Sequence, residues 1–295
     1  MQFPSGKIKP HVGWLALPFA LIFFAYFVLP LVLTIIVSFW DYTDYAIIPD
    51  LIFDNYIYIF DGCPSNEGGL CLTFKTYLST FFFCFFTWLI TLVLGFCVAY
   101  FLAFYVNSIP LQVCLFLVCT IPFWTSNVIR MVSWIPLLGR NGLVNEFFLS
   151  LGIIDQPIEW LLYSSFSVIL ALVHLYTLFM IVPIFNSMIR IDRSIVEAAY
   201  DAGASHRQII FNIIIPLSKT GIIIGSIFVV TVVMGDFLTI GIMGGQQLAS
   251  VGKIINTEMN YLQFPGAAAN AVILLIITIF IIYVMTKFID IRKEL

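Results

Sequence analysis

Long apolar runs dominate the chain, and polar segments separate them. Six runs reach or exceed the roughly 20 residues that a helix needs to cross a bilayer. They cover residues 14–39, 77–105, 112–134, 161–188, 214–240 and 267–289. Strands with alternating apolar and polar positions, which a transmembrane β-barrel would need, are not seen. The pattern predicts an all-α integral membrane protein whose six transmembrane helices form one domain over residues 1–295.

Composition strengthens this prediction. Hydrophobic residues make up 61% of the 295 residues and charged residues 10%, whereas soluble domains average about 25% charged residues. A surface this apolar must face lipid. The first apolar run is longer than the roughly 7–15 apolar residues of a signal peptide. We therefore expect this run to be retained as the first span.

The basic residues predict the orientation, because cytoplasmic loops carry an excess of Lys and Arg. With a cytoplasmic N-terminus, the inner side holds nine basic residues: Lys7, Lys9, Arg190, Arg193, Arg207, Lys219, Lys287, Arg292 and Lys293. The outer side then holds four: Lys75, Arg130, Arg140 and Lys253. We expect both termini in the cytoplasm. Most acidic residues then lie outside, where a net negative face attracts cations.

The polar segment 190–213, between the fourth and fifth spans, has the pattern of two short helices. Ser194-x-x-Glu197 and Ser205-x-x-Gln208 both match a capping box. Gly203 lies between them, where the end of a helix needs a residue that tolerates positive φ. The segment predicts a helix over about 195–202, a tight turn and a second helix.

The first of these helices would expose small and polar side chains. Ala198 and Ala199 let another protein approach closely, and Glu197, Asp201 and Arg207 add polar groups at the rim. Because so short a helix is not stable alone, the spans or a partner must brace it. An ordinary amphipathic connector is the alternative interpretation.

The spacing within this loop resembles the EAA loop of ABC importer permeases. Glu197-Ala198-Ala199 is followed after three residues by Gly203, and after nine more by Ile213-x-Ile215-Pro216. The family pattern is E-A-A-x3-G-x9-I-x-L-P, and Ile215 in place of leucine is the one departure. The resemblance implies a type I importer permease fold with 190–213 as its coupling loop. Glu197, Ala198, Ala199 and Gly203 would then contact a cytoplasmic ATPase subunit.

Three further stretches resemble the first of the two permeases in spermidine/putrescine importers. They are Ile121–Trp134, Leu138–Asn145 and Met234–Gly245. This resemblance implies a bacterial inner-membrane protein that imports polyamines by alternating access. Its partners would be a second permease, two ATPase subunits, a periplasmic binding protein and membrane lipid, with no nucleic acid among them.

The sequence contains no motif for catalysis or nucleotide binding. The phosphate-binding pattern G-x-x-x-x-G-K-[ST] is absent, and "LASVGKI" lacks both its leading glycine and its final Ser or Thr. H-E-x-x-H, C-x-x-C and G-x-S-x-G are absent as well. We expect no enzyme activity, no metal site and no cofactor in this chain, with ATP bound by a partner subunit.

Asp236 is the candidate contact for a cationic cargo, because a carboxylate at membrane depth is costly and typically faces a cavity or a partner. Phe237 beside it, and Trp124 in the third span, can add cation–π attraction. The alternative is that Asp236 caps a helix or pairs with Arg130. We expect Arg130 to anchor a helix end by snorkelling and Glu258 to be an ordinary solvated acid.

Several alternatives remain open at the level of sequence. The importer could carry ferric iron, thiamine or another small solute. A self-contained channel or secondary carrier is the alternative class of protein. Cys63 and Cys71 bracket the first outer loop and can form a disulfide if that side is oxidising, or they can be two unpaired thiols. Gly221-x-x-x-Gly225 predicts close helix packing.

Overall fold

The computed structural model describes residues 10–43, 46–61 and 71–287. Four helical runs within them are long and apolar enough to cross a membrane: Leu17–Val37, Leu72–Tyr105, Glu159–Met188 and Phe264–Thr286. Two bent pairs also qualify: Ile109–Trp124 with Asn127–Ser150, bent by 93°, and His206–Leu217 with Lys219–Gly235, bent by 68°. Counting each pair as one span gives the six spans that the hydropathy predicts.

The chain divides into two compact units, Met1–Gly62 with Ile255–Ile273 and Cys63–Ile254 with Leu274–Leu295. In the first unit, α1 (Pro10–Phe23), a π-helical segment (Phe24–Val28) and α2 (Leu29–Val37) form one span. A hairpin of β1 (Asp41–Tyr42) and β2 (Ile47–Ile48), then α3 (Asp54–Ile59), follow it. The buried Asn55 amide donates to the carbonyls of Ser38 and Trp40 at 3.0 and 2.8 Å, which fixes α3 to the end of α2.

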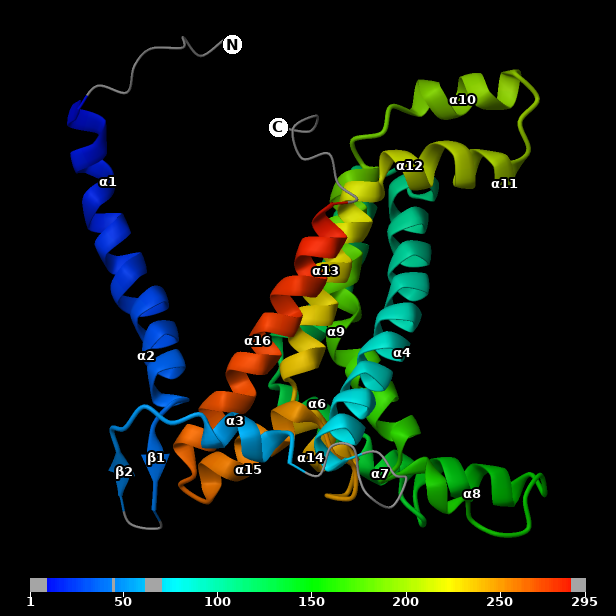
Figure 1. The fold of residues 1–295 in the computed structure, drawn as a ribbon. Coiled ribbons are helices and arrows are strands. Elements are labelled where there is room, and N and C mark those ends of the chain that lie inside the picture. Colours follow the sequence, from blue (N-terminus) through cyan, green and yellow to red (C-terminus); the bar gives the residue numbers. More distant parts are fainter. Residues whose placement is uncertain (1–9, 44–45, 62–70, 288–295) are drawn as a thin grey trace. The chain divides into compact units, whose positions relative to one another are not determined.

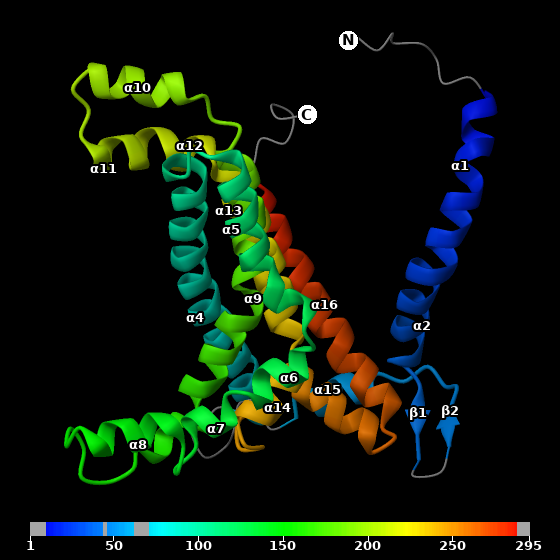
Figure 2. The ribbon, with the colours of Figure 1, turned by 180° about the vertical axis from the view of Figure 1, so that it is seen from behind.

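Three helices form the centre of the second unit: α4 (Leu72–Tyr100), α9 (Ser165–Met188) and α13 (Lys219–Gly235). They lie side by side in Figures 1 and 2. A Cβ added to Gly221 would lie 2.4 Å from the Pro183 carbonyl oxygen, and one at Gly225 would lie 2.9 Å from the Met180 sulfur. The predicted close packing at these two glycines is confirmed.

Short helices cover the two ends of this three-helix centre. At one end lie α10 (Arg193–Asp201), α11 (His206–Ile209) and α12 (Ile215–Leu217), and at the other lie α6 (Asn127–Val132), α7 (Ile135–Leu138), α8 (Leu143–Ser150) and α14 (Leu238–Met243). Figure 2 shows α5 (Ile109–Thr120) running along the centre. π-Helical segments Phe101–Tyr105 and Ile210–Ile214 and 3₁₀ turns Ile121–Trp124 and Glu159–Leu161 complete the unit. The helices α15 (Val251–Asn260) and α16 (Phe264–Thr286) contribute to both units.

Two spans differ from the ranges that the hydropathy predicts. The third, expected over 112–134, ends at Trp124, where Thr125 and Ser126 adopt extended backbone before α6 leaves in a new direction. Pro122 has no N–H to continue the helical hydrogen bonds, and a 3₁₀ turn replaces the last α-turn. The fifth span, expected over 214–240, consists of α12, a break at Ser218 and α13, which ends at Gly235.

Candidate functional site

The loop between α9 and α13 begins with a helix cap that the sequence pattern misassigns. The Asp192 carboxylate accepts from the Ser194 N–H at 3.0 Å, and this hydrogen bond lowers the pKa of Asp192. α10 therefore starts at Arg193, with Ser194 inside its first turn. The predicted Ser194–Glu197 capping box is wrong, because an acidic acceptor two residues earlier satisfies the free backbone donor.

The turn after α10 has the predicted geometry. Gly203 has φ of +81°, and its N–H donates to the Tyr200 carbonyl at 2.9 Å. Ser205 then caps α11: its hydroxyl accepts from the Gln208 N–H at 3.4 Å, while the Gln208 side chain accepts from the Ser205 N–H at 2.8 Å. This second capping box and the helix–turn–helix are confirmed.

α10 presents a polar outer face and packs its other face inward. Glu197, Ala198 and Asp201 are exposed, as is Arg207 on α11. Ala199 is half-buried and packs against the hydrophobic core, so it does not share the exposed face with Ala198. The exposed surface therefore combines Ala198 with charged side chains of both signs, Arg207 among them.

His206 connects this loop to a transmembrane helix. Its Nδ1 lies 2.8 Å from the Tyr200 hydroxyl on α10, and its Nε2 lies 3.4 Å from the Tyr100 hydroxyl on α4. The three side chains help to line a cavity of about 290 Å³ that Glu197 and Arg193 also line. The sequence gives no signal for this bridge, because His206 and Tyr100 are 106 residues apart.

Asp236, at the other end of the unit, is fully engaged by hydrogen bonds. It accepts from the Tyr176 hydroxyl at 2.5 Å, from the Thr239 hydroxyl at 2.7 Å and from the Thr239 N–H at 2.8 Å. The last of these bonds caps the start of α14. The capping role that the sequence left open is observed, whereas the described residues contain no ion pair between Asp236 and Arg130.

Arg130 does not snorkel. It is 7% exposed on α6 and donates to the Asn127 side-chain oxygen. Its buried Nε has no hydrogen-bond partner among the described residues. The expectation fails because α6 turns away from the third span and packs against α9 and α14, so the guanidinium does not lie at a free helix end.

The two aromatic candidates differ in their relation to Asp236. Phe237 follows it in the chain, exposed, at the start of α14. Trp124 is 85% exposed at the end of a 3₁₀ turn. Its ring makes no hydrogen bond or aromatic contact with any residue that the structure describes. Phe237 is thus the chain neighbour of Asp236, and the role of Trp124 in the pathway stays a prediction.

Glu258, in the first unit, is more buried and more strongly hydrogen-bonded than the sequence analysis predicts. Both carboxylate oxygens accept from the Asn270 amide nitrogen at 3.0 Å, and Asn270 is buried. Burial raises the pKa of Glu258, while the Asn270 hydrogen bond opposes that shift. The expectation of an ordinary solvated acid is wrong. The available signal was Asn270 itself, an amide within an apolar span.

The cysteines are consistent with the outer-loop prediction but do not test it. Cys71 is disulfide-bonded, whereas Cys63 lies outside the described residues, so the Cys63–Cys71 pairing stays a prediction. Cys84, Cys97, Cys114 and Cys119 are free. In the described ranges, no group of three or more His, Cys, Asp or Glu residues could hold a metal ion.

The fold is that of known ABC transporter membrane subunits. A subunit of a crystallised bacterial alginate ABC transporter, in complex with an alginate-bound periplasmic protein, superposes with a TM-score of 0.69 at 15% identity. The match covers 94% of this chain and 92% of that one. No family model matches the sequence. The all-α membrane fold of an importer permease is therefore confirmed.

Sequence relatives define the family more closely. The spermidine/putrescine transport system permease protein PotB of Salmonella typhimurium is 34% identical over 280 residues, which cover 94% of this chain and 90% of PotB. PotB of Escherichia coli is 38% identical over 188 residues, or 63% of this chain and 67% of that protein. The chain belongs to the PotB family of permeases, as its resemblance predicts.

Proposed function

We propose that the chain is a membrane-spanning subunit of an ATP-driven, binding-protein-dependent importer of polyamines in the bacterial inner membrane. The observation that carries this proposal is the PotB relationship, which extends over 94% of the chain. The exposed face of α10 supports it, because Glu197, Ala198 and Asp201 lie on the inner side in the orientation that the basic residues favour.

A partner must supply the energy for import. The chain has no phosphate-binding loop of its own, and its α10–α11 loop offers a polar surface for a cytoplasmic ATPase subunit. Closure of a pair of such subunits on ATP would push α10, and the His206 bridge would pass that movement to α4. A second permease completes the pathway, and a periplasmic protein delivers the cargo.

The polar groups of the chain favour a cationic cargo. Glu258 is half-buried and bound by a neutral amide, and no ion pair neutralises it within the described residues. Asp236 adds a second carboxylate near the apolar surface of Phe237. Carboxylates and aromatic faces are the groups that bind ammonium ions. An anionic solute would be repelled.

The test is to purify the tagged chain from membranes with the subunits that accompany it and to measure ATP turnover. Spermidine-loaded binding protein should stimulate turnover, and Asp236→Asn should weaken that stimulation. Asp155→Asn, at an exposed outer position, is the matched control and should have no effect. Stimulation by ferric iron or thiamine in place of polyamines would contradict the cargo, and absence of an ATPase would contradict the class.

A further inference from the structure

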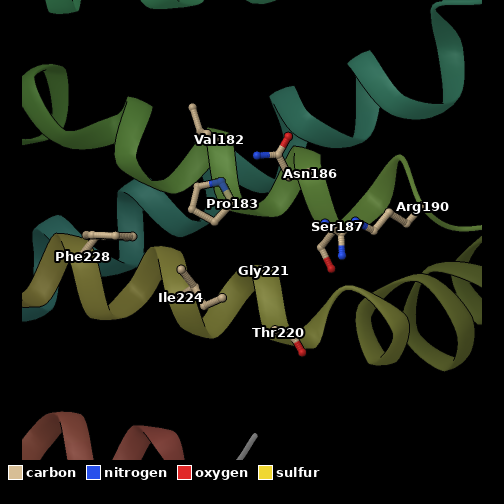
Figure 3. Close-up of a pocket in the computed structure, with 9 residues that line it drawn as sticks. All are labelled: Val182, Pro183, Asn186, Ser187, Arg190, Thr220, Gly221, Ile224 and Phe228. Carbon is tan, nitrogen blue, oxygen red and sulfur yellow. The ribbon is translucent and has the colours of Figure 1, made fainter. Parts of the chain in front are cut away.

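A groove runs between α9 and α13 on the side of the central helices (Figure 3). Its volume is about 330 Å³. The residues that line it are Val182, Pro183, Asn186, Ser187, Arg190, Thr220, Gly221, Ile224 and Phe228. Because Gly221 lets α9 and α13 approach closely at the Pro183 carbonyl, the two helices themselves close the bottom of the groove.

The lining divides by polarity along the helix axes. Val182, Pro183, Ile224 and Phe228 form an apolar part, and the polar side chains gather towards Arg190. Figure 3 shows Phe228 and Arg190 at opposite ends of the groove. Residues 182 and 190 are about 12 Å apart along a helix of 1.5 Å rise per residue. An apolar half and a polar end at this separation suit an amphiphile.

The polar end carries unneutralised positive charge. Arg190, which lines the groove, is exposed just beyond the last turn of α9, and Lys219, the chain neighbour of the lining residue Thr220, is exposed at the first turn of α13. Within the described part of the chain, Arg190, Lys219 and Ser187 form no ion pair and their side chains make no hydrogen bond. The nearest acid in sequence, Asp192, accepts from the Ser194 N–H and forms no ion pair with Arg190 among the described residues.

We propose that this groove binds an anionic phospholipid of the cytoplasmic leaflet. An acyl chain lies along Pro183, Ile224 and Phe228, and the phosphate accepts hydrogen bonds from Arg190 and Ser187. The positive end falls at the inner surface in the orientation that the basic residues predict, where anionic lipids are concentrated and basic pockets between helices bind their headgroups.

A lipid fits this groove better than a polypeptide helix. An α-helix with its side chains is about 10–12 Å across. A single acyl chain is much thinner. The charge complementarity with a phosphate favours an anionic lipid over a neutral one.

The bound lipid would brace the coupling loop. Arg190 is the first residue of the predicted coupling loop, and Thr220 lies in the first turn of α13, beyond that loop. A headgroup at this end of the groove therefore lies beside the segments on both sides of the loop. The lipid would therefore support transfer of movement from α10 to the spans. This inference uses the membrane orientation and does not depend on the polyamine assignment.

The first test measures which lipid remains bound. The chain, with the subunits that accompany it, is placed in nanodiscs of phosphatidylcholine mixed with phosphatidylglycerol, and retained lipid is identified by native mass spectrometry. Wild type should retain phosphatidylglycerol, and Arg190→Gln should reduce that retention about tenfold. Lys287→Gln is the control, because Lys287 lies over the Tyr283 ring on α16, outside the groove. Equal retention in wild type and Arg190→Gln would overturn the proposal.

The second test identifies the occupant without altering the charged end. A photo-crosslinking residue in place of Ile224 should attach to phospholipid in membranes. Attachment to another polypeptide, such as the second permease, would overturn the proposal. In phosphatidylcholine nanodiscs, added inorganic phosphate should not raise the unfolding temperature as phosphatidylglycerol does. An equal effect of free phosphate would overturn the role of the acyl chain.

Discussion

Asp236 and Glu258 are acids in very different environments. Asp236 accepts three hydrogen bonds, one of them from backbone, and its position is fixed by the cap of α14. Glu258 is bound by one amide nitrogen, although an ionised carboxylate has about four acceptor sites. Glu258 therefore keeps free capacity for an ammonium group, and we expect it to contribute more to binding of a cationic cargo.

The first prediction concerns that contribution. Glu258→Gln preserves the size of the side chain and removes its charge. Because a hydrogen bond to a charged group contributes about 1.5–3 kcal/mol, the spermidine concentration for half-maximal uptake should rise at least about tenfold. Uptake by membrane vesicles measures this. Glu146→Gln, at an exposed position on α8, is the control, and an equal effect of both variants would contradict the role of Glu258.

The second prediction concerns pH. Burial raises the pKa of Glu258, so this carboxyl takes up a proton at a higher pH than an exposed glutamate does. Since ammonium binding needs the ionised form, lowering the outside pH should reduce spermidine uptake as it approaches this raised pKa. Glu258→Gln should lack that part of the decline. Parallel pH profiles for the two proteins would contradict the assignment.

At single positions, the sequence predicts the turns and helix caps that depend only on neighbouring residues in the chain. Gly203 and the Ser205–Gln208 box are recognisable because the turn and the cap involve neighbours in the chain. The burial of Arg130 and the Glu258–Asn270 pair depend on packing between distant segments. No local pattern contains that information, and the sequence therefore misjudges both.

Among the elements, the α10–α11 loop combines a strict turn with a weak helix. α10 has nine residues, too few for stability by propensity alone, so its position depends on Gly203 and on the contacts of His206. Gly203 can hold φ of +81° at no steric cost. A residue restricted to negative φ should open the turn and misplace α10.

The third prediction follows. Gly203→Pro should abolish polyamine-stimulated ATP turnover, because proline locks φ near −65°, while the chain remains inserted in the membrane. Gly152→Pro is the matched control: Gly152 also has positive φ, and a Cβ there would meet nothing within 4 Å, as at Gly203. Stimulated turnover in Gly203→Pro at the level of the control would remove the coupling role of the loop.

The fourth prediction concerns the packing of α9 on α13. Gly221→Ala should lower the free energy of unfolding by about 1–3 kcal/mol, the usual cost of overpacking, because the new Cβ would lie 2.4 Å from the Pro183 carbonyl oxygen. Unfolding in detergent measures the change. Gly235→Ala, where a Cβ meets nothing within 4 Å, should be near neutral; equal stability of the two variants would contradict close packing.

Hydropathy predicts the number of spans better than the positions of their breaks and the direction of the chain after each break. The apolar runs mark all six, but the breaks at Thr125–Ser126 and at Ser218 fall inside or beside apolar sequence. The side chains on both sides of each break are largely apolar, so they can face either lipid or the protein core. The direction of the chain after a break is set by what the next helix packs against, which hydropathy does not report.

At the scale of the whole molecule, the chain links two polar regions but contains no nucleotide-binding motif. Its second unit joins an exposed polar loop at one end to the Asp236 network at the other through α4, α9 and α13. Its sequence lacks the G-x-x-x-x-G-K-[ST] pattern that binds nucleotide phosphates. In the proposed function, import against a gradient depends on a partner that hydrolyses ATP, and α10 is the surface proposed to contact that partner.

The most direct test is spermidine accumulation in proteoliposomes. Vesicles with this chain, its partner permease, the ATPase subunits and loaded binding protein should accumulate spermidine only when ATP is hydrolysed. Glu197→Lys should stop accumulation without preventing insertion. Spermidine movement at the same rate through vesicles that contain this chain and no ATPase would contradict the account.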